Sequence, residues 1–576
     1  MRLRGSKMTK IKIKKKDISK ILFWICVLFS IVRICVNFKM AYLIRPDFGS
    51  DDGLLFNYAD SLAGFNWLGE YNSQTLVKGM SYSLLLAFCI RTSIPYSVVL
   101  SGLDILAAVT FVLAIKEKIK SDYILKIVYI LLLFNPISLD YLARQRMYRN
   151  SLIPDMTVIV FSCMIGVFFR RNKSFKELLG WNLATGAVLC YFYYLREDSI
   201  WVMPFVLVVT ILNLIDTFLI NGKKELDIKG KIKKTILFLL PLIMLVCCTF
   251  TIKIINKKYY GVFLVNDRTG GYFADAMSDL YRIDGKNENK SVWISKDAIN
   301  TALKNSSTLR TIKKEVNESI KTWGGGKEVK GDLITWSLRQ AAENKGLYKD
   351  ANTANDFWKK VHIELKAARK DGKIKTKKGI FFTKQATGVK YNELPKYMML
   401  SVENMNKISS YSECKMQGEL PLYPNPAKIR YYEVRYGVYA PLELNEEDTK
   451  MVQSKKLAIV SNRVIKMYKK TSKIINLVVV LSYIMITICV LYQLIKKKYD
   501  HLECWLMITG IALSAYCLIF GVSFFTSWFT KDMEVYIRPF YSSGAYGLIQ
   551  IGKYLCILSA VELAAKAFKN LKNKKK

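Results

Sequence analysis

The chain has 576 residues, of which 51% are hydrophobic and 13% are aromatic, and its 87 Lys and Arg against 46 Asp and Glu give a net charge of +41. Several apolar runs approach the roughly twenty residues that a membrane-spanning helix needs. The composition therefore excludes an ordinary soluble enzyme and predicts a multi-pass membrane protein. The positive charge does not predict binding to nucleic acid, because the basic residues lie largely beside apolar runs and no nucleic-acid motif accompanies them.

Basic residues predict the orientation, because cytoplasmic loops of membrane proteins are enriched in Lys and Arg. The first 20 residues are strongly basic and are expected in the cytoplasm, so the first span leads outward. Ten crossings then place every strongly basic short loop inside. These spans are predicted at about 21–38, 98–115, 123–139, 156–169, 178–194, 200–219, 236–255, 474–495, 506–525 and 541–568. The apolar segment 82–90 is too short to cross and is expected to be a juxtamembrane or re-entrant helix.

This topology predicts a mainly α fold, a transmembrane bundle of about ten spans plus the short helix. Its parts are a cytoplasmic N-terminus (1–20), an N-terminal transmembrane catalytic module (21–256) with external loops 39–97, 140–155 and 195–199, an extracytoplasmic domain (257–473), C-terminal transmembrane helices (474–568) and a cytoplasmic tail (569–576). The extracytoplasmic domain is expected to be largely helical, either α or α+β. Segments 332–347 and 354–373 have apolar residues three and four apart, which predicts helices, whereas prolines and aromatics at 420–441 predict irregular or short-strand structure.

Charged residues gather on the loops that this topology places outside. Asp47, Asp51 and Asp52 follow the first span directly, and Lys78 precedes the short helix. A charged carboxylate costs several kilocalories in hydrocarbon, so acids at a membrane boundary suggest a site, although a solvated loop is the plainer alternative. The later outer loops add Arg144, Arg146, Arg149, Asp155, Arg196, Glu197 and Asp198.

These residue types suit transfer of a group from a lipid phosphate. A carboxylate can accept the proton of an attacking hydroxyl, and Lys or Arg can neutralise a departing phosphate. We expect the base to be Asp51 or Asp52. The expected phosphate-binding residues are Lys78, Arg144, Arg146, Arg149 and Arg196, and the candidate acceptor or metal ligands are Asp47, Asp155, Glu197 and Asp198. Two alternatives stay open: Lys78 could snorkel at an interface, and residues 196–198 could be a self-neutralised turn.

Cofactor requirements are weakly constrained by the sequence. There are only two histidines, His362 and His501, which excludes a histidine-rich metal site. No CxxC motif suggests a metal or redox pair. A carboxylate-bound divalent ion such as Mg²⁺ or Mn²⁺ is not excluded. No cofactor is therefore assigned with certainty.

The order of these features resembles the GT-C superfamily of integral-membrane glycosyltransferases, which includes protein mannosyltransferases, aminoarabinose transferases of lipid A and oligosaccharyltransferases. The resemblance covers residues 18–256 and is carried by GSDDG at 49–53, KGMSY at 78–82 and LRED at 195–198. It implies a polyprenyl-phosphate-linked sugar donor, an external active site and an acid of the first loop as base. Many relatives have two prolines where this chain has Gly79 and Met80, and the second loop lacks a clean acidic pair.

The leading hypothesis is an inverting hexosyl- or pentosyltransferase at the outer face of a bacterial cytoplasmic membrane. It would move a sugar from a polyprenyl-phosphate donor onto an envelope glycan, lipid or polymer acceptor, with membrane lipids around it. The alternatives are a transporter or flippase of lipid-linked sugars and a non-catalytic scaffold for envelope assembly. Transporters commonly show paired repeats and broken helices at mid-membrane. The chain shows no repeat and concentrates charge at one face, which favours the enzyme.

Overall fold

The computed structural model describes residues 15–220, 226–445, 447–499, 501–529 and 537–574. This part of the chain is 72% helical and contains no strand, only isolated bridges between separate segments. The predicted mainly α class is confirmed, and the described part of residues 257–473 is α rather than α+β. Residues 1–14 of the predicted cytoplasmic N-terminus and 575–576 of the predicted tail lie outside the described residues.

Eight helices in the described part of the chain are long and apolar enough to cross a membrane. They are α1 (Lys15–Lys39), α4 (Tyr96–Ile115), α5 (Asp122–Leu133) with the turn that follows it, α8 (Met203–Leu219), α10 (Ile228–Tyr260), α19 (Thr449–Ile495), α20 (Leu502–Phe525) and α22 (Ser543–Lys574). They support a multi-pass membrane protein, while the count of ten crossings stays a prediction. The other two predicted spans correspond to α6 (Ile153–Phe169) and α7 (Phe175–Tyr193), of 17 and 19 residues.

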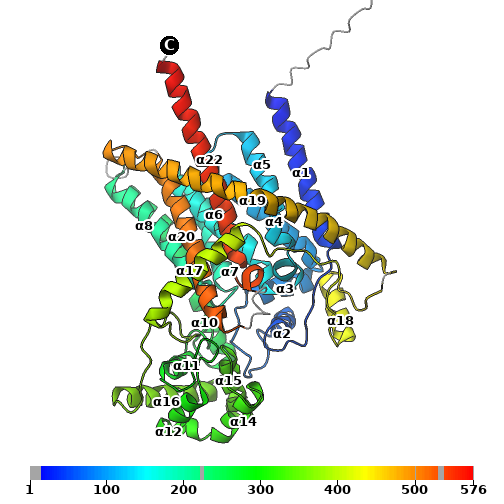
Figure 1. The fold of residues 1–576 in the computed structure, drawn as a ribbon, viewed down its shortest axis with the longest axis vertical. Helices are drawn as coiled ribbons and strands as arrows, with labels where there is room; N and C mark the ends of the chain where they lie inside the picture. The colour runs from blue at the N-terminus through cyan, green and yellow to red at the C-terminus, as the bar shows by residue number, and fades with distance from the viewer. Residues whose placement is uncertain (1–14, 221–225, 446, 500, 530–536, 575–576) are drawn as a thin grey trace, which may run out of the picture.

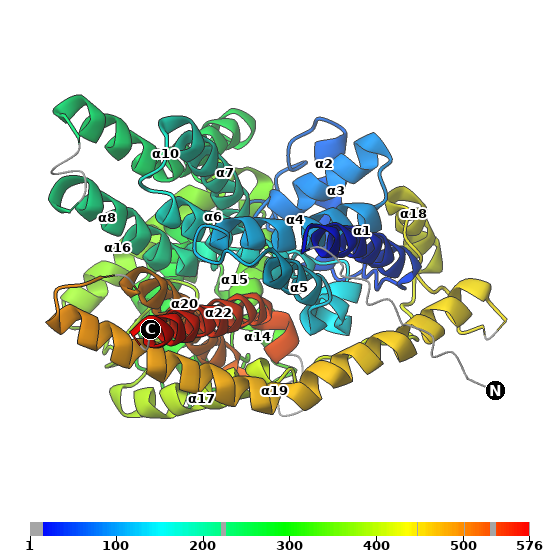
Figure 2. The same cartoon turned by 90° about the horizontal axis from the view of Figure 1, so that it is seen from above.

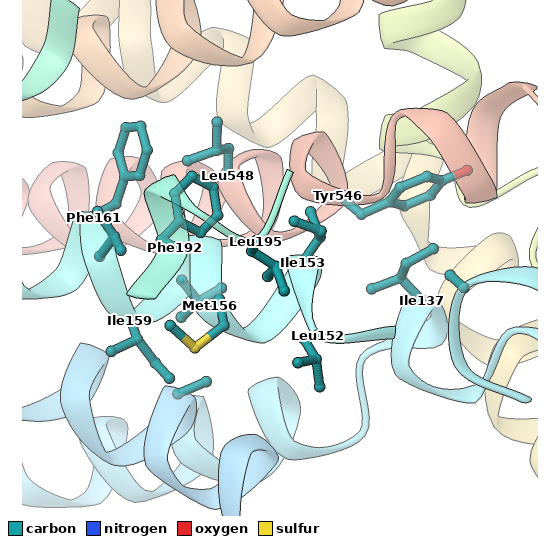
Figure 3. Packing of buried hydrophobic residues seen from close by; sticks show 14 of the residues in the cluster. Ile137, Leu152, Ile153, Met156, Ile159, Phe161, Phe192, Leu195, Tyr546 and Leu548 are labelled. Atoms are coloured by element: carbon teal, nitrogen blue, oxygen red, sulfur yellow. The ribbon is translucent and has the colours of Figure 1, made fainter. Parts of the chain in front are cut away.

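Helix α6 forms the centre of the bundle. All of its residues are buried, and it packs against α4, α7 and α22. A helix surrounded by protein needs no polar face, which explains why this one is apolar on all sides. Figure 3 shows α6 side chains such as Met156 and Phe161 near Phe192 of α7, Leu548 of α22 and Leu195. Leu195 thus anchors the loop 195–198 in this core.

The short helix predicted around 82–90 is α3 (Ser81–Thr92), which has 12 residues and packs on α2 (Asp52–Ala63). At 1.5 Å per residue it is about 18 Å long, well short of the roughly 30 Å hydrocarbon core of a bilayer. Its length therefore agrees with a helix that does not cross. Residues 45–80, which precede α3, contain α2, and the charged residues of this segment lie beside the bundle.

Residues 257–473 separate into several packing units. A helical unit with its own core comprises α11 (Tyr272–Arg282), α12 (Lys296–Asn305), α13 (Ser307–Arg310), α14 (Lys313–Trp323), α15 (Leu333–Asn344) and α16 (Ala351–Lys370). The two helices predicted in this region correspond to α15 and α16. Helix α17 (Leu394–Ser409) packs on α20, and α19 continues through the predicted boundary at 473/474 as a single helix. Figures 1 and 2 show α19 running obliquely along one side of the bundle.

The prediction of irregular or short-strand structure at 420–441 is wrong for the middle of this segment, which forms helix α18 (Pro426–Tyr436). The Asn425 side chain accepts a hydrogen bond from the backbone of Lys428, Pro426 lies in the first turn, and Gly437 ends the helix in the left-handed conformation. These are strong local start and stop signals. The aromatic residues stabilise it by packing, since the ring of Tyr432 stacks on Phe56 of α2 at 4.7 Å.

A buried network of charges joins four elements of the bundle. Asp104 on α4 accepts hydrogen bonds from Arg33 on α1 and from Arg144, both at 2.7 Å, and Arg144 also donates to Asp155 on α6 at 2.6 Å. Asn37 donates to Asp104 at 2.9 Å. Two arginines and two aspartates neutralise one another, which a charge buried in a bundle requires. The network fixes the turn that begins at residue 141.

Replacing Asp104 by Asn should destabilise the bundle, because Arg33 and Arg144 would then share a single buried carboxylate. We expect a loss of about 3–5 kcal/mol in the free energy of unfolding, measured by denaturant unfolding in detergent. The matched control is Asp122→Asn, which removes an acid from the more exposed Asp122–Lys126 pair of α5 and should cost under about 1 kcal/mol. Equal stability of the two variants would show that the network does not hold the bundle together.

Candidate functional site

A cavity of about 2180 Å³ lies between the bundle and the helical unit α11–α16. Its walls come from the loops 43–51, 78–80, 141–150 and 193–201, from α8, α10 and α20, and from residues of the helical unit such as Trp336. In Figure 1 the helical unit lies at the end of the bundle opposite the beginning of α1 and the end of α22. The cavity is therefore placed at the junction of the two parts, away from the beginning of α1 and the end of α22.

Eight of the eleven predicted site residues line this cavity: Asp47, Asp51, Lys78, Arg146, Arg149, Arg196, Glu197 and Asp198. They come from three loops that are as much as 151 positions apart in sequence, from 47 to 198. The remaining three predicted residues, Asp52, Arg144 and Asp155, lie behind the lining. The loops meet because α6 packs against both α4 and α7, and because the Ser81 amide at the start of α3 donates to the Tyr194 carbonyl at the end of α7, 3.2 Å away.

Asp51 and Lys78 form an ion pair in the cavity wall. Lys78 Nζ lies 2.5 Å from Asp51 Oδ1, and the Tyr148 hydroxyl lies 3.3 Å from the same oxygen. The Lys78 side chain is 4% exposed and that of Asp51 is 37% exposed, so the carboxylate faces the open space. Burial acts to raise the pKa of Asp51, but Lys78, with smaller contributions from Arg146 and Arg149, holds this pKa well below its usual range. Asp51 is therefore ionised at neutral pH.

Glu197 is held by a cation and a backbone donor. Arg149 Nη1 lies 2.6 and 2.7 Å from its two carboxylate oxygens, and the Gly79 amide donates to it at 2.6 Å. Burial opposes ionisation, but Arg149 and then Lys78 lower the pKa of Glu197 to about 2. A proline at position 79 would lack the N–H that binds Glu197.

Asp52 supports the site from behind rather than lining it. Its side chain is completely buried and accepts two hydrogen bonds from Arg146, one of them from Nε at 2.9 Å. The Arg146 guanidinium lies 4.8 Å from the ring centres of both Tyr148 and Phe540. Asp52 therefore orients Arg146, and of the two predicted bases only Asp51 reaches the cavity.

Two further pairs of predicted residues neutralise each other. Arg144 and Asp155 neutralise each other within the buried network, so we no longer assign them to a phosphate, an acceptor or a metal. Arg196 binds Asp198 through two hydrogen bonds of 2.8 and 2.6 Å, which is the self-neutralised turn that the sequence left open. Both of these residues still line the cavity.

Sequence reasoning missed some of the charged groups in the lining. Arg268 binds Asp332 through distances of 2.8 and 2.9 Å, and its guanidinium lies 4.9 Å from the centre of the Trp336 ring. The partners are 64 positions apart, so no local pattern indicates the pair. Arg45 also lines the cavity. It belongs to the stretch that the sequence analysis emphasised, but an isolated arginine beside a span carries no distinguishing signal.

The side chains present do not fit a divalent cation. In the described part of the chain, no three His, Cys, Asp or Glu side chains gather into a potential metal site. Asp51, Glu197 and Asp198 each face a cationic side chain instead of one another. We therefore derive no step through Mg²⁺ or Mn²⁺.

One side of the cavity is apolar. It is formed by Ile200, Trp201 and Pro204 at the start of α8, by Leu245 and Val246 of α10, and by residues 516–525 of α20. All three helices belong to the candidate membrane spans. A lining that combines charged loops with apolar residues of such helices suits a ligand with a charged head and a hydrocarbon chain.

Comparison of the chain with protein-family models, with curated proteins and with solved structures finds no match. The resemblance to the GT-C superfamily therefore stays a prediction.

Replacing Gly79 by Ala should disturb the contact between the 78–80 and 194–198 loops. A Cβ at this position would lie 2.2 Å from the Tyr194 carbonyl oxygen, so the backbone must shift. We expect a loss of about 1–3 kcal/mol in stability and faster amide exchange of Gly79 and residues 194–198 in hydrogen–deuterium exchange. The control is Gly102→Ala on α4, where a Cβ meets no atom within 4 Å. A Gly79→Ala protein as stable and as protected as this control would contradict the packing.

Proposed function

We propose that the protein is an inverting glycosyltransferase that uses a polyprenyl-phosphate-linked sugar and works at the outer face of a bacterial cytoplasmic membrane. The observation that carries the proposal is the amphipathic cavity. Its lining holds an exposed carboxylate beside cationic side chains on the loops, and apolar residues contributed by α8, α10 and α20. A lipid phosphate needs both surfaces, whereas a soluble sugar nucleotide would gain nothing from the apolar one.

In the proposed reaction, the polyprenyl chain lies along the apolar wall and the phosphate lies near Lys78 and Arg149. The acceptor hydroxyl attacks the anomeric carbon while the bond from this carbon to the phosphate oxygen breaks. The hydroxyl proton passes to Asp51, and polyprenyl phosphate leaves with the bonding electrons. A single displacement inverts the configuration of the sugar. The cationic groups stabilise the negative charge that develops on the phosphate.

The Asp51–Lys78 pair allows donor binding to make Asp51 a stronger base. In the free protein Lys78 stabilises the Asp51 carboxylate and makes it a weak base. A donor phosphate that attracts the Lys78 ammonium would weaken this pair and bring a second negative charge close to Asp51. Both effects raise the pKa of Asp51, because they disfavour its charged form. The carboxylate would thus become a stronger base when the donor is bound.

The arrangement of basic loops supports the proposed sidedness. The loops predicted to be cytoplasmic meet one another, since Glu503 contacts Lys118 and Arg171, and Glu117 lies 3.2 Å from Lys173 Nζ. The helical unit α11–α16 lies at the opposite end of the bundle in Figure 1. Under the positive-inside rule, the basic end and both termini are cytoplasmic, and the cavity opens on the outer side.

Asp51→Asn should lower the rate of sugar transfer by about 10²–10⁴-fold, because the amide cannot accept the proton. The measurement is release of polyprenyl phosphate and formation of glycosylated acceptor by the reconstituted protein. Asp122→Asn is the control, since Asp122 also pairs with a lysine, at 2.7 Å, but on α5 and outside the cavity lining. Full activity of Asp51→Asn at normal expression would exclude Asp51 as the base. Movement of labelled lipid without release of polyprenyl phosphate would indicate a transporter.

The pH dependence tests the coupling between Asp51 and Lys78. Because Lys78 holds the pKa of Asp51 below its usual range, kcat/KM of the native protein should not fall on the acid side until the pH is below about 4, the ordinary pKa of an aspartate. In Lys78→Met, burial acts without the opposing ammonium, so the pKa of Asp51 rises and the acid limb should move up by at least about one pH unit. Lys126→Met, which removes the partner of Asp122, should leave the limb in place. If the acid limb of Lys78→Met does not shift, the group whose protonation lowers kcat/KM is not Asp51.

A further inference from the structure

Cationic side chains in the cavity lining are almost all neutralised by acids. The pairs are Lys78–Asp51, Arg146–Asp52, Arg149–Glu197, Arg196–Asp198, Arg268–Asp332 and Lys384–Asp275. Arg45 is different, because no ion pair joins it to any acid in the described part of the chain, although it lines the same cavity. Its positive charge is therefore available to a ligand.

Arg45 is held in place by aromatic rings instead of by an acid. Its guanidinium carbon lies 3.9 Å from the ring centre of Phe48 and 5.0 Å from that of Tyr423. The Arg45 Nε atom is buried and has no hydrogen-bond partner among the described residues. Asp47, the nearest acid in sequence, lies instead 3.7 Å from Lys428 Nζ. Aromatic faces position a cation without neutralising it, and the rigid fork of a guanidinium suits two oxygens of one oxyanion.

The position of Arg45 separates it from the apolar wall. Tyr423 belongs to the segment just before α18, whereas the apolar wall belongs to α8, α10 and α20. Figures 1 and 2 both show α18 on one side of the molecule and α8 and α20 on the other. A lipid lying along the apolar residues of α8, α10 and α20 would therefore leave Arg45, which stacks on Tyr423 near α18, available to the second substrate.

We propose that Arg45 binds an oxyanion of the acceptor, so that the acceptor is an anionic glycan or polymer carrying phosphate or carboxylate groups. This inference rests on the proposed function only in naming the second substrate. The binding it describes can be measured without any transfer reaction. In this proposal Arg45 makes the protein prefer anionic over neutral acceptors, while Lys78 and Arg149 bind the phosphate of the donor.

The experiment measures binding of three oligomers of similar length to the full chain in nanodiscs: tetra(glycerol phosphate), tetragalacturonate and neutral maltotetraose. At least one anionic oligomer should bind 10-fold or more tightly than maltotetraose, and added salt should weaken only anionic binding. Arg45→Gln should lose this preference and bind all three alike. Arg45→Lys, which keeps the charge but not the fork, should retain a preference reduced several-fold. Preference for the phosphate or for the carboxylate oligomer identifies the oxyanion, and either supports the inference.

The control variant is Arg91→Gln. Arg91 on α3 is also stacked on an aromatic ring, with its guanidinium carbon 4.2 Å from the centre of Phe65, but it does not line the cavity. This variant should keep the full preference for the anionic oligomers. The inference is overturned if native protein binds maltotetraose as tightly as both anionic oligomers, or if Arg45→Gln keeps the preference. It is also overturned if Arg45→Gln instead weakens binding of undecaprenyl phosphate. Anionic preference without sugar transfer would contradict the proposed function alone.

Discussion

The ion pair between Asp51 and Lys78 joins the loop that follows α1 to the segment before α3, and the rest of the candidate site is arranged around it. Both side chains line the cavity, and the Asp51 carboxylate is the more exposed of the two, while the Lys78 side chain is almost fully buried. Gly79, the next residue, donates its amide to Glu197 and so brings in the third loop. Arg149 completes this chain of contacts from the second loop. Three loops far apart in sequence are thus connected through charges that would be costly to bury alone.

The ion pairs that the predicted acids and bases form also explain why these residues have different roles. Asp104, Arg144 and Asp155 satisfy one another inside the bundle and fix its helices. Asp52 forms an ion pair with Arg146 and so positions it at the cavity wall. Asp104, Arg144, Asp155 and Asp52 are residue types that often form active sites. Here they are already bound by their partners and do not line the cavity, so they do not reach a ligand. Arg45 is the contrasting case, because aromatic stacking orders it and leaves its charge uncompensated.

The cavity combines two environments because two kinds of structure meet there. Helices α8, α10 and α20 supply apolar side chains that also suit a bilayer, while the loops at their ends and the helical unit α11–α16 supply charge. Helix α6 makes this possible by filling the centre of the bundle, so that the loop ends on either side of it are held in a rigid frame. An amphipathic ligand would bridge the two environments without burying an unpaired charge.

The sequence by itself determined the helical membrane class, the short helix α3, and the helices α15 and α16, because hydrophobic periodicity and run length are local properties. It also indicated most of the residues that line the cavity, since charges beside apolar spans are conspicuous. It did not distinguish Asp51 from Asp52, or Arg146 from Arg144, because adjacent residues of one type differ only in the direction that the folded backbone gives them. Only the tertiary structure decided which charges are paired, with partners up to 94 positions away for Asp52. Burial makes pairing obligatory, and the choice of partner depends on how distant segments pack.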